Sequence, residues 1–140
     1  AGVGESIINH GLCGQRLGDV SSASMALSLL TKQIDGAVLV FHHALLDIAF
    51  IQRYAYESFA CPMIFAYVDT LALEQKRLAQ QGKSAALQLA ACRERYHLPS
   101  AFQHNAMFDA LATAELLLAQ YAHMKGRRDL TLSELNLNIA

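Results

Sequence analysis

The stretch AVLVFHHALLD, residues 37–47, decides the fold class. Its first part, AVLVF, is an uninterrupted apolar run with β-branched residues, bounded by Gly36 and by two histidines. Such a run predicts a β-strand over residues 37–41 that is buried on both faces rather than an amphipathic edge strand. A helix is expected to follow from about residue 44 to residue 58.

The apolar patterns and turn residues in the rest of the chain predict several helices and only a few strands between them. Ser21 or Ser22 would cap a helix that continues to Ile34. The other expected elements are a short strand within residues 63–70, helices over 70–81, 84–96 and from 105 or 106 to 124, and a short turn within 130–136. This alternation indicates one α/β domain over residues 1–140, with a sheet in the middle. One or two strands cannot cover five helices, so we expect further strands outside these residues.

The composition favours a protein with a covered face. Apolar residues make up 54% and charged residues 16%, against a typical charged share of roughly 25%. A chain of this size cannot easily hide so much apolar side chain, so we expect a partner subunit or additional sequence to cover part of it. The first residue, Ala1, is not a methionine, which favours a chain that has lost its beginning.

The net charge of −1 argues against unaided electrostatic attraction to nucleic acid, which draws on many lysine and arginine contacts to phosphate. A polyanionic ligand would need metal ions or local basic clusters. The candidate clusters are Lys76-Arg77, Arg93/Arg95 and residues 125–128. Short clusters of this kind are more often solvated surface, and we interpret them in that way.

The cysteines and the longest apolar runs bear on localisation. Three cysteines without a C-x-x-C pair predict neither a disulfide framework nor a zinc site. No signal peptide is recognisable, and the apolar runs are interrupted well short of the ~20 residues that span a membrane. We therefore expect a cytoplasmic protein without a membrane-spanning segment.

A pattern of His-x-Ala-x-x-Asp occurs twice, from His42 to Asp47 and from His104 to Asp109. On one helix, residues five apart lie about 140° around the axis from each other, so the two groups could not act together from within it. The histidine is therefore expected in the loop before the helix, and the aspartate in its first turns. The helix dipole favours a carboxylate at that position.

Two aspartates placed in this way suit a divalent cation. Ligand sites of open α/β sheets lie at the carboxyl ends of strands, and Mg²⁺ or Mn²⁺ takes carboxylate oxygens. His104 beside such an ion could remove a proton from water. Alone, Asp47 would more often be an ordinary helix-start carboxylate and His104 a loop histidine, but their repetition in matching contexts favours a shared function.

Two segments resemble motifs of a known family. LVFHHALLDIAFI, residues 39–51, and HNAMFDALATAELLLAQ, residues 104–120, are similar to the second and third motifs of the DnaQ-like, DEDD-type 3′–5′ exonucleases. This superfamily includes the bacterial DNA polymerase III epsilon subunit and ribonuclease T, and the third motif resembles its subgroup with a histidine base. INHGL at 8–12 and VDTLAL at 68–73 also resemble family segments, so the resemblance covers roughly residues 5–123.

The resemblance implies a ribonuclease H-like exonuclease fold, with a central mixed sheet flanked by helices and apparently truncated at the N-terminus. It implies hydrolysis of terminal phosphodiesters of DNA or RNA to nucleoside 5′-monophosphates with two Mg²⁺ or Mn²⁺ ions. By position, Asp109 would be a direct metal ligand, Asp47 would hold or orient the metal site, and His104 would be the base. The substrate would be the 3′ end of single-stranded DNA or RNA, and a polymerase subunit or a second copy could be a partner.

The residues expected to contact the substrate are His10, His42 and His43. The family's second motif has His-Asn where this chain has His42-His43, and Phe where it has Leu46. Contacts to the terminal nucleotide are therefore expected to differ.

The first family motif, Asp-x-Glu, occurs nowhere in the 140 residues. Either the chain is the carboxyl-terminal portion of a longer protein, which we favour, or it is an inactive relic. The 140 residues alone should have no exonuclease activity, since they lack the carboxylates that hold two metal ions.

Two alternatives stay open. One is a catalytically inactive DEDD-like scaffold that binds a polymerase or another protein through an exposed apolar face. The other is an all-helical metal phosphohydrolase of the HD type, suggested by His42, His43 and Asp47, although no adjacent His-Asp pair occurs.

Overall fold

The computed structural model describes residues 17–100, 105–126 and 128–140. The described chain starts with helix α2 (Leu17–Gln33), which leads through a turn at Gly36 into strand β1 (Val38–Phe41). The elements that follow are α3 (Ala44–Phe59), β2 (Ala66–Asp69), α4 (Thr70–Gln80), α5 (Leu89–Arg95), α6 (Ala106–Met124) and β3 (Asn138–Ile139).

The strands form a mixed sheet in the order β1-β2-β3. β1 and β2 are parallel, and Phe41 pairs with Asp69 at their carboxyl ends. β3 is antiparallel to β2, and the amide of Ala140 continues the pairing by donating to the carbonyl of Phe65 at 2.9 Å. Because β1 and β2 end at the same level, the segments that follow them lie side by side.

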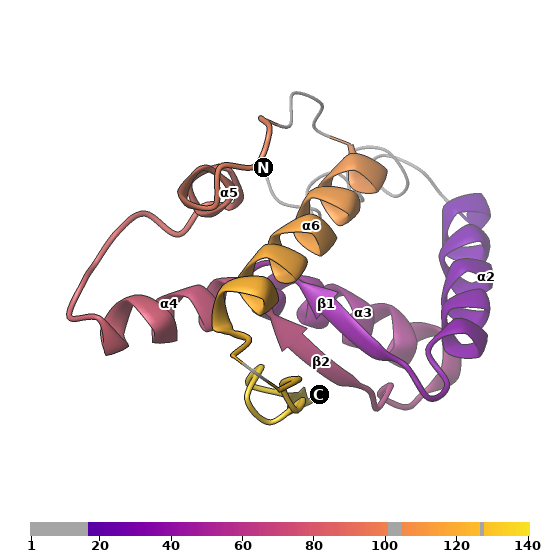
Figure 1. The fold of residues 1–140 in the computed structure, drawn as a ribbon. Helices are drawn as coiled ribbons and strands as arrows, with labels where there is room; N and C mark the ends of the chain where they lie inside the picture. Colours follow the sequence, from indigo (N-terminus) through magenta and orange to yellow (C-terminus); the bar gives the residue numbers. More distant parts are fainter. Residues whose placement is uncertain (1–16, 101–104, 127) are drawn as a thin grey trace.

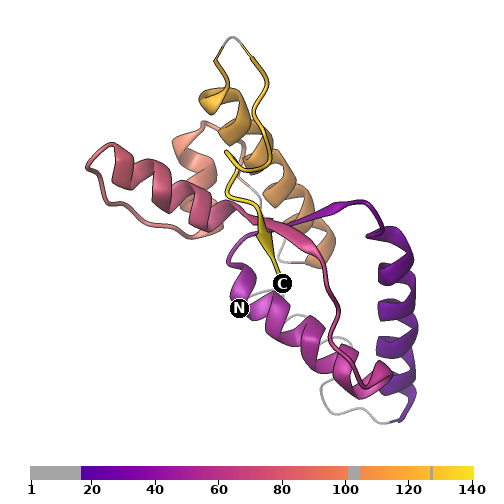
Figure 2. The ribbon, with the colours of Figure 1, turned by 90° about the horizontal axis from the view of Figure 1, so that it is seen from below.

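Helices cover both faces of this sheet, as the two views of the ribbon show (Figures 1 and 2). Leu39 and Phe41 pack on one face, in a core formed with α2 and α3 around Leu27 and Ala55. Val38 packs on the other face, together with Val68 of β2, in a core formed with α4, α6 and the carboxyl-terminal segment. The alternation of side chains along β1 thus directs apolar groups into two separate cores.

The α/β class and the mixed sheet flanked by helices are confirmed. The strand over residues 37–41 forms as Val38–Phe41, and the last long helix begins at Ala106 and ends at Met124 as expected. The sheet also argues against an all-helical phosphohydrolase of the HD type.

One expectation about β1 is wrong. β1 contacts a core on each face, but within the described residues it is an edge strand of the sheet. Its four residues are therefore half-buried rather than fully buried. An apolar run indicates what covers the two faces of a strand, but it does not indicate whether a second strand pairs along its edge.

Three other elements differ from expectation. α2 includes Ser21 and Ser22 instead of being capped by either of them. α5 begins at Leu89, because the preceding segment is held as a loop by a bond from His42 to the carbonyl of Leu87. β3 was not expected, since its two residues carry no strand pattern of their own.

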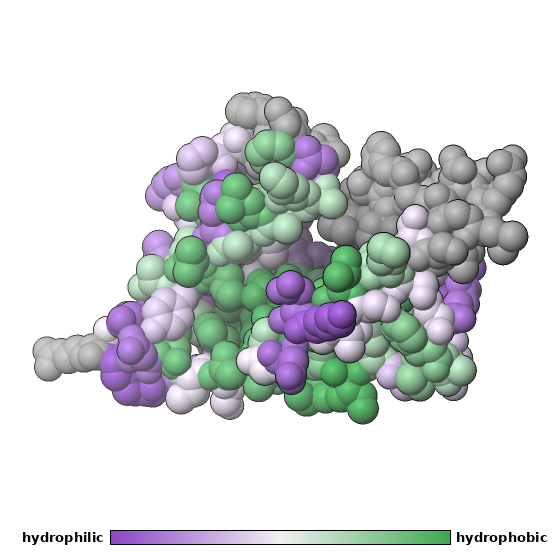
Figure 3. All heavy atoms as spheres, turned by 90° about the vertical axis from the view of Figure 1, so that its right-hand side faces the viewer, coloured by the Kyte–Doolittle hydropathy of each residue, from purple (hydrophilic) through white to green (hydrophobic). Residues whose placement is uncertain are grey.

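The expected excess of apolar side chains is visible at the surface. Ile64 is 79% exposed, Leu45 75% and Met107 74%. Figure 3 shows hydrophobic residues gathered over much of the face seen from the right-hand side of Figure 1. None of the helices in the described part of the chain has the length and apolar character needed to cross a membrane.

Candidate functional site

The turn between β1 and α3 places the first copy of the His-x-Ala-x-x-Asp motif at the carboxyl end of the sheet. His42 directly follows β1, and His43 is the N-cap residue of α3. His43 adopts the left-handed conformation, with φ of 67°, and its side chain forms no capping bond. This conformation is uncommon for a residue other than glycine, so the turn needs support from elsewhere.

Asp69, the last residue of β2, supplies this support. Its carboxylate accepts hydrogen bonds from the amides of His43 and Ala44, both at 2.9 Å. It also caps α4 by accepting from the amide of Leu71 at 2.9 Å. One buried carboxylate therefore satisfies amides at the start of two helices, which would otherwise lack partners.

His42 is held by both of its ring nitrogens. Nε2 lies 2.8 Å from the carbonyl oxygen of Leu87, and Nδ1 lies 2.8 Å from Oγ1 of Thr70. Burial is the largest influence on the pKa of His42 and lowers it, although the bond to Leu87 and the charges of Asp69 and Glu74 act in the opposite direction. In the neutral ring, Nε2–H donates to Leu87 because a carbonyl can only accept. Nδ1 then faces the Thr70 hydroxyl, whose single proton also lies within reach of the Phe41 carbonyl oxygen, 3.1 Å from Oγ1.

Asp47 lies in the first turn of α3, as expected. Burial raises the pKa of this carboxyl from 3.8 to about 6; the charge of nearby His43 lowers it and that of Asp69 raises it further. A partly buried carboxyl with a raised pKa is a frequent feature of functional sites, although structural networks produce it too.

Asp109 occupies the matching place in the first turn of α6. The helix is capped by Asn105, whose side-chain oxygen accepts from the amide of Phe108 at 2.9 Å. α6 contacts β1, α4 and α5. Both aspartates of the repeated motif therefore lie at the start of a helix, where the dipole favours their negative charge.

Two of the predicted site residues, His104 and His10, lie outside the described residues. His43 has an exposed position next to Asp47, whereas His42 is engaged inside the protein. The catalytic, substrate-binding and metal-binding roles of all six residues stay predictions.

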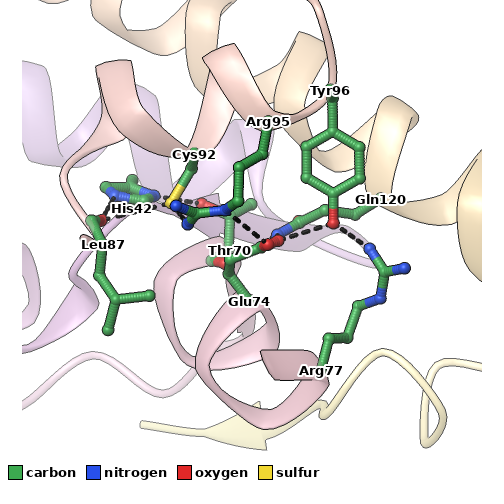
Figure 4. Close-up of polar contacts among 9 residues, drawn as sticks. All are labelled: His42, Thr70, Glu74, Arg77, Leu87, Cys92, Arg95, Tyr96 and Gln120. Atoms are coloured by element: carbon green, nitrogen blue, oxygen red, sulfur yellow. Dashed lines mark hydrogen bonds and ion pairs between the residues drawn. The ribbon is translucent and has the colours of Figure 1, made fainter. Parts of the chain in front are cut away.

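A second polar cluster joins α4, α5 and α6, and Figure 4 shows its members. Glu74, which is 3% exposed, accepts from Arg95 at 3.2 Å, from Tyr96 at 2.7 Å and from Gln120 at 3.0 Å. Burial alone would raise the pKa of Glu74, but these hydrogen bonds and the Arg95 charge together lower it. Arg77 donates to the Tyr96 hydroxyl and extends the cluster.

This cluster was not predicted from the sequence. The one signal of it in the sequence is that Glu74 and Gln120 lie on helix faces that also carry buried leucines, such as Leu78 and Leu116. Such spacing predicts burial, but it does not identify the partners.

Arg93 also departs from expectation. It is 5% exposed and donates to the carbonyls of Ala112 and Pro99, each at 2.8 Å, and to Glu115 at 2.9 Å. The interpretation of Arg93 and Arg95 as solvated surface is therefore wrong. Arg93 instead joins α5 to the chain on both sides of residues 101–104.

The described donors do not complete a metal site by themselves. Within residues 17–100, 105–126 and 128–140, no group of three or more histidine, cysteine or acidic side chains could hold a metal ion. Asp47 and Asp109 offer two carboxylates, and no Asp-x-Glu occurs in the sequence to add others. A two-metal centre would need ligands beyond these.

Comparison with known families agrees with the two motifs. The family described as "DNA polymerase III subunit epsilon-like, C-terminal domain" matches residues 12–120, well over half of the chain. The chain therefore belongs to this family of DnaQ-like, DEDDh-type exonucleases. Neither the curated proteins nor the solved structures contain a match.

Proposed function

We propose that this chain, as a member of the epsilon-like family, carries one half of the active site of a metal-dependent 3′–5′ exonuclease. The substrate would be the 3′ end of single-stranded DNA or RNA, and the products nucleoside 5′-monophosphates. Residues 1–140 would form a single, partial exonuclease domain, and the carboxylates of an Asp-x-Glu would come from residues outside it.

One observation carries this proposal. The repeated motif sets Asp47 and Asp109 in the first turn of two different helices, α3 and α6. Helix α3 follows β1 at the carboxyl end of the sheet, which is where α/β proteins bind ligands. The helix dipole by itself explains a carboxylate in a first turn, so it is the shared His-x-Ala-x-x-Asp spacing in both places that favours a common function.

Each residue would have a defined part in the reaction. Asp109 and Asp47 would offer carboxylate oxygens, which Mg²⁺ and Mn²⁺ prefer as ligands. Two such ions in a complete site would stabilise the charge that develops on a phosphodiester. His104 would take the proton of the attacking water. His10, His42 and His43 would lie toward the terminal nucleotide, with His42 keeping the bonds of its ring nitrogens to Thr70 and Leu87.

The proposed partners and localisation follow the family. A polymerase subunit or a second copy of the chain would cover the exposed apolar side chains. The setting would be the cytoplasm, where nucleic acids and free Mg²⁺ are accessible.

The test uses the protein encoded by the complete reading frame, together with the 140-residue chain. Release of nucleoside monophosphates is measured from 3′-labelled single-stranded DNA and RNA with Mg²⁺, Mn²⁺ or EDTA. We expect metal-dependent release by the full protein and none by the 140 residues. Asp109→Asn and His104→Gln should each lower kcat by about 10²-fold or more, whereas Asp35→Asn, an exposed turn residue, should not.

Two results would contradict the proposal. Nucleotide release by the 140-residue chain would show that the missing carboxylates are not needed. Full activity of the Asp109→Asn protein would remove Asp109 from the reaction.

A second function is favoured by a specific observation. The absence of Asp-x-Glu, together with exposed apolar side chains such as Met107 and Leu118, also fits an inactive scaffold that binds a protein partner. A complete reading frame without an upstream Asp-x-Glu, encoding a protein that releases no nucleotides, would favour the scaffold.

A further inference from the structure

We propose that Asp69 is a positioning residue that holds the turn carrying His43 and thereby places Asp47 for the reaction. This inference rests on the proposed function, since it concerns the same site. It adds a residue that lies outside both copies of the His-x-Ala-x-x-Asp motif.

The geometry of the carboxylate supports this role. Oδ1 of Asp69 accepts from the amides of His43 and Leu71, and Oδ2 accepts from the amide of Ala44, all at 2.9 Å. The strand register places Asp69 opposite Phe41, one residue before the turn begins. The side chain therefore reaches from the end of β2 across to the start of α3.

These contacts distinguish Asp69 from a metal ligand. Its two oxygens already accept three hydrogen bonds, and the residue is only 9% exposed. A metal ion would have to displace these three amides, which have no other partner among these contacts. Asp69 therefore acts through the backbone of α3.

The turn depends on this carboxylate for its conformation. His43 holds a left-handed conformation without a capping bond of its own, and Ala44 is 1% exposed, so water cannot easily replace the lost acceptor. Asp47 lies one helical turn after His43, on the same side of α3. A relaxed turn would shift or fray the first turn of α3 and move the Asp47 carboxylate.

The test compares Asp69→Asn with wild type in the complete protein, alone and combined with Asp47→Asn. Asparagine keeps the size of the side chain, but its NH2 group, which replaces one carboxylate oxygen, cannot accept a hydrogen bond from a backbone amide. Asp69→Glu, which retains the charge, serves if the asparagine variant does not fold. Asp35→Asn is the matched control at the other end of β1. Activity is measured under single-turnover conditions, so that residual rates are detectable.

We expect Asp69→Asn to lower the single-turnover rate constant at least tenfold and to raise the Mg²⁺ concentration for half-maximal activity several-fold. In the Asp47→Asn background it should lower the rate less than twofold, because a residue that acts through Asp47 has nothing left to position. Amide hydrogen exchange should become faster at His43 and Ala44, while α6 keeps its protection.

An equal loss of rate in both backgrounds would overturn the inference, because it would indicate a general structural role. Unchanged rate and Mg²⁺ dependence in Asp69→Asn would overturn it too, as would unchanged exchange at His43 and Ala44. A wild-type protein without any nuclease activity would instead refute the proposed function. In that case faster exchange would still establish that Asp69 holds the turn, but the claim about the reaction would fall with the function.

Discussion

In the folded protein, burial disfavours the negative charge of Asp47, whereas binding of a metal ion would require that charge. Burial raises the pKa of the Asp47 carboxyl to about 6, so the ionised form is less favourable in the folded chain than in the unfolded chain. A metal ligand needs the ionised form. A raised pKa therefore indicates that the metal-free fold is destabilised by this side chain at neutral pH.

The first prediction follows from this cost. In EDTA, Asp47→Asn should stabilise the 140-residue chain above pH 6, because it removes a charge that the folded state disfavours. The folded pKa lies above the usual 3.8, so wild-type stability should fall as the pH rises from about 4 through 6. The full shift would correspond to roughly 3 kcal/mol, and partial exposure reduces the expected gain to about 1 kcal/mol.

Urea denaturation between pH 4 and pH 8 measures this difference. The gain should shrink toward pH 4, where the folded carboxyl is almost fully protonated and the unfolded carboxyl, with its usual pKa of 3.8, is partly protonated. Asp35→Asn is the control and should show no such pH dependence. A variant that is less stable than wild type at pH 8 would contradict the assigned direction.

The positions of Asp47 and Asp109 could be predicted from the sequence because each depends only on its distance from a helix start. The role of Asp69 could not. Its bonds to His43 and Ala44 depend on the register between β1 and β2, which no local pattern encodes. Contacts between elements distant in sequence are therefore the part that local reasoning misses.

At the scale of elements, the buried cluster around Glu74 connects three helices of the α6 side. Glu74 comes from α4, Arg95 from α5 and Gln120 from α6. Breaking a buried ion pair leaves an uncompensated charge, which costs far more than the loss of an exposed pair. This cluster should therefore determine how firmly α6 is held.

The second prediction concerns this cluster. Glu74→Ala should destabilise the chain by roughly 3 kcal/mol, because Arg95 and Gln120 lose a buried acceptor. Glu57→Ala, which removes an exposed pair with Arg53, should cost less than about 1 kcal/mol. Thermal or urea denaturation checks both variants. Equal effects would contradict the view that the Glu74 cluster joins the helices.

Helices and strands were predictable to different degrees. α6 was predicted with its bounds, because a long apolar segment capped by Asn105 has few alternatives. α5 was predicted too long, since Ser84 and its neighbours favour a helix locally but the bond from His42 to Leu87 holds a loop. β3 was missed because it owes its conformation to pairing with β2.

At the scale of the whole molecule, three features accompany the two aspartates. β1 has an unpaired edge within the described sheet, and apolar side chains such as Leu45 and Met107 are exposed. In the part of the chain that the structure describes, no group of three or more histidine, cysteine or acidic side chains could hold a metal ion. The apolar excess was predictable from composition. Which surfaces carry it was not, because that depends on how the helices pack.

The most direct test of the account is the position of a bound metal ion. Crystals of the complete protein are soaked in Mn²⁺, and the anomalous scattering of manganese locates the ion. We predict a peak about 2 Å from a carboxylate oxygen of Asp109, with Asp47 bound to the same ion directly or through one water. A peak distant from both residues, or the two carboxylates on opposite sides of the molecule, would contradict the account.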